Sequence, residues 1–330
     1  IDLVIRAWRP GPSHDQSSTS TKKNRHKLTV LVQNNSSSFI IFAANLSLDT
    51  ALQIDLVIRA CAREGAWRPG PSDVQYEEYK RSAEAAGFSR TVHSDSSASL
   101  LCMVNPSNPT GEYLKVDDLM EYLEQTCERG STVIVDESMQ PWVGPHWRED
   151  SLISKGAWRR QMSIEKGVDV FVMHSWTKIW SCAGIRLGSV IAPTPQLMVK
   201  IKSKQVPWSV NSVALVFLTV AIADKEFMRR TWALTPVWRL NIVSKITEAF
   251  PAWRCHGEPF LSWVWIDTFD EDQAEAAVAA AKAAGCPIRW GEPGYKKATI
   301  IRLGVRNELS FEVLLGALKK VLVSRRMTAA

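Results

Sequence analysis

The spacing of apolar residues predicts strands that alternate with helices over the middle of the chain. Short apolar runs at residues 100–104, 132–135 and 168–173 are typical of buried strands. Between the first two runs, apolar residues from 116 to 127 recur on one helix face, and Gly130 follows as a stop signal. This alternation predicts a mostly parallel sheet with helices on both faces.

Polar residues follow each of these three strands. Asn105 comes after the first, Asp136 and Glu137 after the second, and His174 and Ser175 after the third. Since ligands of parallel sheets bind outside the carboxyl ends of the strands, we expect these side chains to face one crevice. Upstream, the pattern predicts helices over 54–62 and 76–86, the second ended by Gly87.

The C-terminal part of the chain has a different pattern. A long apolar helix is predicted over 209–225, where it could link two domains. After it come a strand at 260–267, a helix at 270–284, a strand at 299–303 and a helix at 311–323. This order predicts a separate, smaller α+β domain.

These patterns divide the chain into a tail at 1–38, a large domain at 39–225 and a small C-terminal domain at 226–330. The tail is rich in Ser, Thr, Asn and Lys, and we expect it to be largely mobile. Its opening IDLVIRAWRPGPS returns in two pieces at 54–60 and 66–72. A repeat this short and irregular indicates a duplicated or misjoined coding segment rather than a repeat architecture.

Composition excludes several classes of protein. The 330 residues are 45% hydrophobic and 22% charged, the balance of a soluble globular protein. A net charge of +6 without a dense Lys/Arg run argues against nucleic acid, and the longest apolar run, 213–223, is too short for a membrane span. Six scattered Cys without CxxC spacing argue against a zinc site and favour a reducing compartment such as the cytoplasm, with organelle targeting left open.

Four motifs point to chemistry: Asn-Pro-Ser-Asn-Pro-Thr-Gly at 105–111, Val-Asp-Glu at 135–137, Ser-Trp-Thr-Lys at 175–178 with Gly-Ile-Arg-Leu-Gly at 184–188, and Ile-Arg-Leu at 301–303. In order and together they resemble the class I/II aminotransferases, over about residues 54–325. The resemblance implies the α/β fold of the fold-type I enzymes that use pyridoxal 5′-phosphate. That fold has a mostly parallel seven-stranded sheet with helices on both faces, plus a smaller α+β C-terminal domain.

The resemblance assigns three residues to the cofactor ring. Lys178 would form the Schiff base with the cofactor aldehyde and move the proton at the substrate α-carbon. Asp136 would keep the pyridine nitrogen protonated. Asn108 would hydrogen-bond the phenolic oxygen of the ring.

Four further residues take roles by the same resemblance. Arg186 and Ser175 would bind the cofactor phosphate, and Arg302 would bind the substrate carboxylate through a bidentate pair. Tyr76 would stack on the cofactor ring, since it lies three residues before a Tyr that precedes Gly87 by eight. His174 is expected to be a packed or exposed imidazole rather than a catalytic acid, because Lys178 already fills the acid–base role.

The chain departs from the family pattern in several places. Met139 stands where many relatives carry a Tyr, and the interval from Asp136 to Lys178 is 42 residues. The glycine-rich phosphate turn expected before Ile54 contains no glycine, so Ser47 or Thr50 would have to substitute. Residues 39–46 are weakly similar to the N-terminal arm that closes the substrate site in the family.

Three functions remain open at this point. The first is an aminotransferase similar to the histidinol-phosphate branch, in amino-acid biosynthesis, with an amino acid or amino phosphate and a 2-oxo acid as substrates. The second is a lyase similar to threonine-phosphate decarboxylase, and the third is an inactive family member or a faulty gene model. The resemblance also implies a homodimer.

Overall fold

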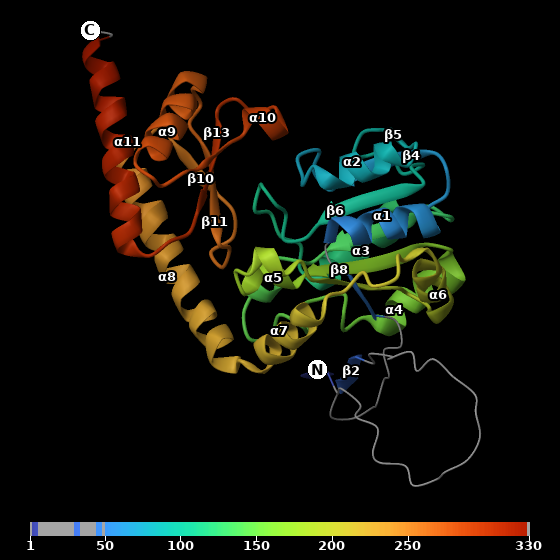
Figure 1. Ribbon diagram of the computed structural model, residues 1–330. Coiled ribbons are helices and arrows are strands. Elements are labelled where there is room, and N and C mark those ends of the chain that lie inside the picture. Colours follow the sequence, from blue (N-terminus) through green and yellow to red (C-terminus); the bar gives the residue numbers. More distant parts are fainter. Residues whose placement is uncertain (1, 6–29, 34–43, 48–49, 329–330) are drawn as a thin grey trace, which may run out of the picture.

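The computed structural model describes residues 2–5, 30–33, 44–47 and 50–328, and side chains from residue 51 to residue 320. Two sheet-based units lie side by side, and the long helix α8 runs along both of them (Figure 1). In the predicted tail, only β1 (Asp2–Ile5) and β2 (Val30–Gln33) are described, and they pair antiparallel. The other tail residues lie outside the described part of the chain.

The larger unit is built on a seven-stranded sheet in the order β3-β9-β8-β7-β6-β4-β5. The five strands from β5 to β8 are parallel, whereas β9 runs antiparallel to β8 and β3 antiparallel to β9. This arrangement confirms the predicted mostly parallel sheet. The strands are β3 (Ala44–Ser47), β4 (Ala66–Gly70), β5 (Ser89–Arg90), β6 (Leu100–Val104), β7 (Thr132–Asp136), β8 (Asp169–Ser175) and β9 (Gly188–Ile191).

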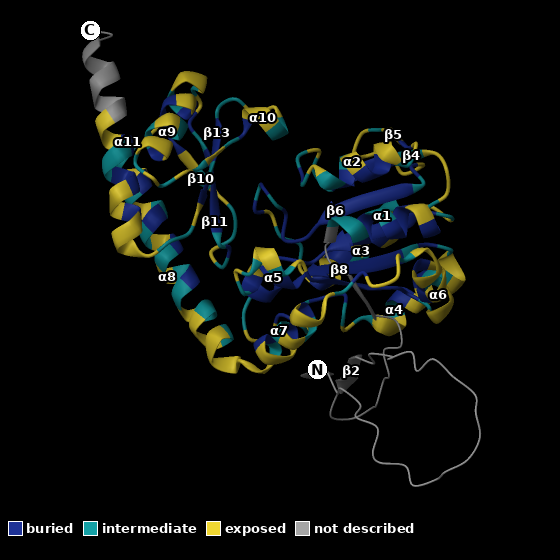
Figure 2. Cartoon of the chain, viewed as in Figure 1, coloured by how far each residue is buried: buried dark blue, intermediate teal, exposed yellow. Residues whose placement is uncertain are grey.

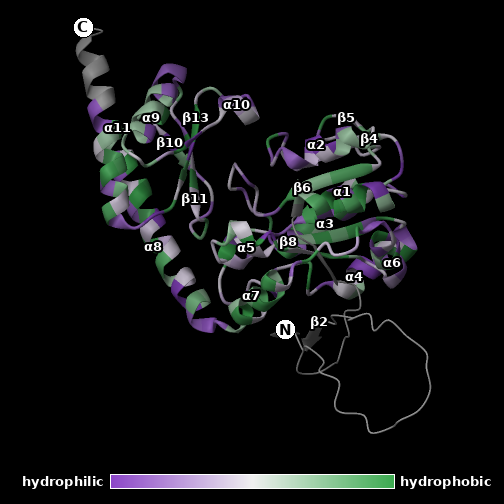
Figure 3. Cartoon of the chain, in the orientation of Figure 1, coloured by the Kyte–Doolittle hydropathy of each residue, from purple (hydrophilic) through white to green (hydrophobic). Residues whose placement is uncertain are grey.

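Helices cover both faces of this sheet because its central strands are apolar on both sides. Along β6, Cys102 and Val104 pack on one side and Leu101 and Met103 on the other, and all are buried (Figures 2 and 3). On the first side lie α1 (Thr50–Cys61), α2 (Glu78–Ala85) and α6 (Pro195–Lys204), and on the second lie α3 (Val116–Thr126), α4 (Gly156–Gln161) and the π-helical turn Met162–Lys166.

Helix boundaries differ by a few residues from the sequence-based expectation. Helix α1 begins at Thr50 and not at Ile54, and α2 begins at Glu78, so Tyr76 precedes the helix. Gly87 has φ +90°, the left-handed conformation expected just after a helix. No helix of the described residues is long and apolar enough to cross a bilayer.

The smaller unit has a four-stranded antiparallel sheet in the order β10-β11-β13-β12. One face of this sheet packs on α9, α11 and the C-terminal half of α8. The elements are β10 (Arg254–His256), β11 (Trp263–Asp267), α9 (Glu271–Ala283), β12 (Arg289–Trp290), α10 (Glu292–Tyr295), β13 (Ile300–Gly304) and α11 (Glu308–Thr328).

A helix occupies most of the predicted range 209–225, but it does not link the two units, because it ends at Ala223 and a second helix begins at Lys225. Helix α7 (Ser212–Ala223) packs on the larger unit, and the Asp224 carboxylate then caps α8 (Lys225–Ala249) by accepting from Phe227 N at 2.9 Å. Helix α8 packs Trp232 on the larger unit and Ile242 in the core of the smaller unit. The link between the units is therefore α8.

Candidate active site

Polar residues at three adjacent strand ends gather along one edge of the large sheet. Strands β6, β7 and β8 are parallel neighbours, so their carboxyl ends meet at this edge. The Asn105 amide donates to the Asp136 carbonyl at 2.9 Å, and the Glu137 amide donates to the Met173 carbonyl at 2.8 Å. The side chains that follow these strands therefore share one site.

Asp136 is a buried carboxylate whose local partner is a backbone amide. Its Oδ1 accepts from Ser138 N at 2.8 Å, and its side chain forms no ion pair within residues 51–320. The hydroxyl of Tyr79 is fully buried beside this carboxylate, and burial, followed by the charge of Asp136, raises the pKa of Tyr79 well above its usual range. A carboxylate this buried is costly unless a cationic or proton-donating group faces it.

Tyr76 lies beside the same carboxylate. Its ring meets the Tyr79 ring edge to face, with centroids 6.2 Å apart and planes at 80°. Burial raises the pKa of Tyr76, and the charges of Glu78 and Asp136 raise it further. Tyr76 is thus half-buried and close enough to sense the Asp136 charge.

Lys178 lies on the short helix α5 (Trp176–Ile179), which begins where β8 ends. Its side chain is exposed, whereas Thr177 and Ile179 on either side are buried. Ser175 anchors the start of this helix: its amide donates to Ser138 Oγ at 2.7 Å, and its hydroxyl lies 3.0 Å from Thr177 Oγ1. The lysine is therefore displayed on a fixed turn.

Arg186 follows a 3₁₀ turn, Ala183–Ile185, and has the left-handed φ of +55°. Its guanidinium is exposed and donates to the Ala183 carbonyl at 3.0 Å. Two residues later, Gly188 is the strand partner of Ser175. Arg186 and Ser175 thus lie on neighbouring segments at the end of the sheet.

The predicted phosphate turn lies outside the described residues. Ser47 is the last residue of β3 and Thr50 is the first residue of α1, and residues 48–49 between them are not described. The side chains of Ser47 and Thr50 are also outside the described part of the chain. Of the predicted arm at 39–46, only the three residues from Ala44 are described, as part of β3.

Arg302 enters the site from the smaller unit. On β13, Ile301 and Leu303 face the helices of that unit, so Arg302 points from the other face of the sheet. Its Nη1 donates to Asn108 Oδ1 at 2.6 Å. Burial lowers the pKa of Arg302, and its strand partner is a second arginine, Arg289.

A second contact fixes the loop that carries Asn108. The indole N–H of Trp263 on β11 donates to the Pro109 carbonyl at 2.8 Å. The Glu258 amide also donates to the Gly111 carbonyl at 3.2 Å. The smaller unit therefore holds residues 108–111 through three hydrogen bonds, including the one from Arg302.

The family model of the aminotransferases of class I and II matches residues 70–240, just over half of the chain. This chain belongs to the class I and II aminotransferases. The matched residues contain Asn108, Asp136, Lys178 and Arg186, whereas Arg302 lies beyond them.

Curated relatives align with part of the chain. Histidinol-phosphate aminotransferase 2 of Nitrosospira multiformis is 27% identical over 146 residues, which are 44% of this chain and 34% of that protein. The Ralstonia nicotianae protein of the same name is 30% identical over 151 residues, 46% of this chain and 36% of that protein. Threonine-phosphate decarboxylase of Salmonella typhimurium is 28% identical over 133 residues, 40% of this chain and 33% of that protein. The chain thus spans about a third of the length of the curated relatives it matches.

Solved structures match the fold over most of the chain. Histidinol-phosphate aminotransferase from Clostridium acetobutylicum has a TM-score of 0.71 at 18% identity, covering 84% of this chain and 83% of that one. L-threonine-O-3-phosphate decarboxylase from Porphyromonas gingivalis has a TM-score of 0.69 at 14% identity, covering 85% and 83%. These likenesses confirm the predicted aminotransferase fold.

Two residues near the site are packed rather than exposed to it. Met139, which replaces the Tyr of many family members, is buried in an apolar cluster with Trp142 and Trp263. His174 is also buried, stacks on Trp176 at 5.0 Å and places Nε2 3.4 Å from Glu137 Oε2. Of the two positions expected for His174, packed or exposed, the structure shows the packed one.

Sequence patterns did not reveal several residues that surround this candidate site. Ser138 and Thr177 support Ser175, and Arg289 and Tyr295 lie near Arg302. A hydroxyl next to a motif residue is a weak signal in sequence. The partner of Arg302 could be identified only from the strand register.

Proposed function

We propose that this chain is a pyridoxal-phosphate-dependent aminotransferase that acts on an amino acid or amino phosphate, with a 2-oxo acid as the second substrate. The observation that carries the proposal is the 2.6 Å hydrogen bond between Arg302 and Asn108. It brings an arginine of the smaller unit to the sheet edge that presents Asp136 and Lys178. Membership of the class I and II aminotransferase family and the names of the relatives support the same proposal.

The residues at this edge fit the cofactor. Asp136 is buried without a cation among the described side chains, so a protonated pyridine nitrogen would supply the missing partner. The half-buried ring of Tyr76 lies near the same carboxylate and would provide a stacking surface. Ser175 and Arg186 would hold the phosphate.

Asn108 is oriented for a donor role. Its Oδ1 is occupied by the Arg302 guanidinium, so its Nδ2 group is the part of the amide left to donate. An anionic phenolic oxygen is a suitable acceptor for it. Arg302 therefore sets the direction of the Asn108 amide and can also bind a substrate carboxylate with its remaining N–H groups.

Lys178 provides the movable proton. Bound pyridoxal phosphate would supply an aldehyde that reacts with amines and a ring that stabilises negative charge on the substrate α-carbon. The Lys178 amine is exposed at the sheet edge on a turn held by Ser175, so it would take and return the α-proton from a fixed position.

The arginine pair favours a substrate with two anionic groups. Arg289 and Arg302 lie directly opposite each other on β12 and β13, and like charges at such positions repel. The guanidinium of Arg289 lies 5.7 Å from the Tyr295 ring centroid, which offsets part of this cost. A substrate amino acid with a phosphate or a second carboxylate would offset the remaining repulsion between the two guanidinium groups.

Decarboxylation is the second candidate. The Salmonella typhimurium relative is a threonine-phosphate decarboxylase, and Met139 removes the Tyr hydroxyl found in many aminotransferases of the family. Carbon dioxide release from L-threonine phosphate would support this candidate. Glutamate formation from histidinol phosphate and 2-oxoglutarate would support transamination instead.

We also propose a homodimer formed through α7. Val213, Val216 and Val220 are each about two-thirds exposed, at 67%, 65% and 66%, and they lie along one side of the helix. Such a stripe needs a partner, and a second copy of the chain is the occupant we infer. Val216→Glu should produce monomers in light scattering, whereas an unchanged mass would contradict this interface.

The six Cys are free thiols, which fits a reducing compartment such as the cytoplasm. All six lie within residues 51–320.

Borohydride trapping tests the proposed cofactor role of Lys178. After reduction of the protein with pyridoxal phosphate, mass spectrometry should find the cofactor on the peptide that contains Lys178. Lys178→Ala should lose this label, and Lys202→Ala, which changes a lysine on α6, should keep it. Absence of label under saturating cofactor would favour an inactive family member.

A further inference from the structure

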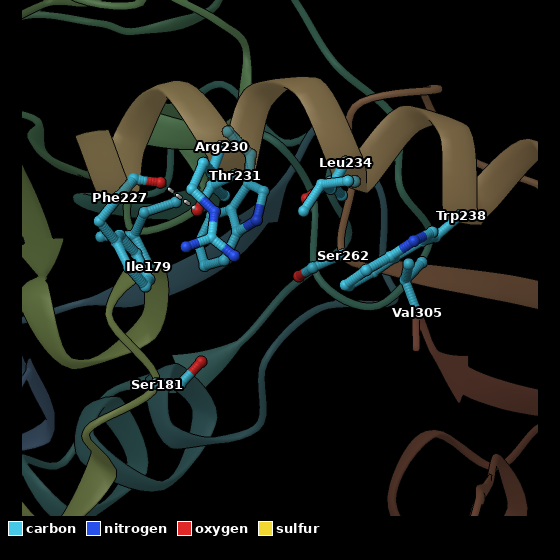
Figure 4. Close-up of a pocket in the computed structure, with 11 residues that line it drawn as sticks. Ile179, Ser181, Phe227, Arg230, Thr231, Leu234, Trp238, Ser262 and Val305 are labelled. Carbon is cyan, nitrogen blue, oxygen red and sulfur yellow. Dashed lines mark hydrogen bonds between the residues drawn. The ribbon is translucent and has the colours of Figure 1, made fainter. Parts of the chain in front are cut away.

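A cavity of about 340 Å³ lies beside α8, between the two units (Figure 4). Its lining comes from four parts of the fold: Trp142 after β7, Ile179 and Ser181 just after Lys178, Arg230 and Trp238 on α8, and Ser262 and Val305 next to the small sheet. None of the residues assigned above to cofactor or substrate lines it. The cavity is therefore separate from the proposed catalytic site, although Ile179 is adjacent to Lys178.

Most of the cavity wall is apolar. Trp142 and Trp238 contribute indole rings, and Ile179, Leu234 and Val305 contribute aliphatic surface. The volume lies within the range of small-molecule sites, which are typically about 300–1,000 Å³ and lined mainly by apolar side chains. This lining suits a ligand with a flat hydrocarbon or aromatic body.

One cation lines the cavity, and it has no ion-pair partner within the described residues. The neighbouring Arg229 binds Glu226 through both carboxylate oxygens, at 2.6 and 2.8 Å. The charge of Arg230 contributes only a smaller part of the lowering of the Glu226 pKa. Figure 4 shows the Arg230 side chain below α8, on the side of Ile179, where its N–H groups can meet an anion in the cavity.

We propose that this cavity is a second ligand site, for a small ring-bearing carboxylate. The ring would lie against Trp238 and Leu234, and the carboxylate would pair with the Arg230 guanidinium. The planar guanidinium of Arg230 matches the two oxygens of a carboxylate, and the hydroxyls of Ser181 and Ser262, which also line the cavity, can supply further donors. Because the lining comes from both units, a bound ligand would also restrain their relative position.

Indole-3-propionate is a suitable probe, with indole-3-propanol as its uncharged analogue. Each would be titrated by calorimetry into the full chain saturated with pyridoxal phosphate. We expect the acid to bind, and Arg230→Gln to weaken it about tenfold or more, as loss of a charge-assisted pair predicts. Arg229→Gln removes the same charge one residue away, outside the lining, and should change the affinity by less than about twofold.

Three results would overturn the proposal: no binding of the acid, equal affinities for the acid and the alcohol, or equal effects of the two arginine substitutions. Weakening by Arg302→Gln but not by Arg230→Gln would place the probe in the substrate site and would also overturn it. Hydrogen exchange gives an independent location, since bound probe should protect residues 227–238 of α8. Failure of the chain to retain pyridoxal phosphate would leave this test valid, because no proposed cofactor residue lines the cavity.

Discussion

The guanidinium of Arg302 donates to Oδ1 of Asn108 at 2.6 Å and joins two residues that are 194 positions apart in the chain. Asn108 lies in the loop that follows β6 of the large sheet, and Arg302 lies in the middle of β13. The contact is charge-assisted and partly buried, so it is stronger than a neutral surface hydrogen bond. Arg302 and Asn108 therefore couple the position of the small unit to the geometry of the proposed site.

Asn108→Asp should weaken both cofactor and substrate binding. The new carboxylate would pair with Arg302 and would have no N–H to donate to the phenolic oxygen. We expect the dissociation constant of pyridoxal phosphate to rise about tenfold or more in a spectrophotometric titration. Asn211→Asp is a control, because an Asp can still cap α7 by accepting from Ala214 N and loses only the long 3.5 Å hydrogen bond from Nδ2 to the Ile185 carbonyl. Similar losses in both variants would contradict the assignment.

Asp136→Asn should separate cofactor binding from turnover. The amide oxygen can still accept from Ser138 N, so the local fold should persist, but the negative charge is lost. Without that charge the cofactor nitrogen is less protonated, and turnover should fall by about a hundredfold or more. Steady-state kinetics and cofactor titration would measure the two effects. Asp150→Asn, which changes an aspartate bound to Tyr113 and Val116, should reduce stability more than turnover.

Gly111→Ala should loosen the contact between the two units. Gly111 has φ +85°, and an added Cβ would lie 2.6 Å from the Gly257 Cα, a backbone atom that cannot move aside easily. Gly87 has φ +90° with nothing within 4 Å of the added carbon, so Gly87→Ala isolates the backbone strain. We expect a loss of unfolding free energy of about 1–2 kcal/mol for Gly87→Ala and about 3 kcal/mol or more for Gly111→Ala. Equal losses in urea denaturation would contradict the steric argument.

Local patterns predicted the sheet edge well because burial there is continuous. Residues 100–104 are apolar on both faces and form β6 as predicted, and helix α3 buries Val116, Leu119 and Leu123 as its spacing indicated. Because these strands are parallel, the motif residues that follow them must lie at the same edge of the sheet. Their chemistry was inferred from the family resemblance.

Tertiary pairing is the part that local sequence does not determine. The same four residues, Asp-Leu-Val-Ile, form strand β1 at 2–5 and part of helix α1 at 55–58. The pairing of Arg289 with Arg302 also depends on strand register, which no local pattern encodes. The helix predicted over 209–225 is present as α7 but ends at Ala223, where the Asp224 carboxylate caps α8, and α8 is the helix that links the units.

Ionisation of the Cys61 thiol should lower the free energy of unfolding as the pH rises above 9. Burial at the end of α1 raises the pKa of Cys61 from 9.0 to about 11, with a smaller opposing effect from Lys200. Between these values the unfolded chain has lost the thiol proton while the folded chain keeps it. The protonated thiol therefore contributes fully to the stability of the folded state below pH 9.0, and this contribution is lost as the pH rises towards 11. The expected total loss is about 2–3 kcal/mol of unfolding free energy from this group.

Cys61→Ala tests this dependence. The variant should be less stable than the parent at pH 8 by about 1 kcal/mol, because a buried side chain is truncated. Its unfolding free energy should then fall less steeply between pH 9 and pH 11, since one proton linkage is gone. Ser82→Ala removes a buried group on α2 that does not titrate, so it should shift the curve without changing its slope. Parallel curves for the parent and Cys61→Ala, measured by urea denaturation at each pH, would show that the thiol is not the source of the alkaline loss.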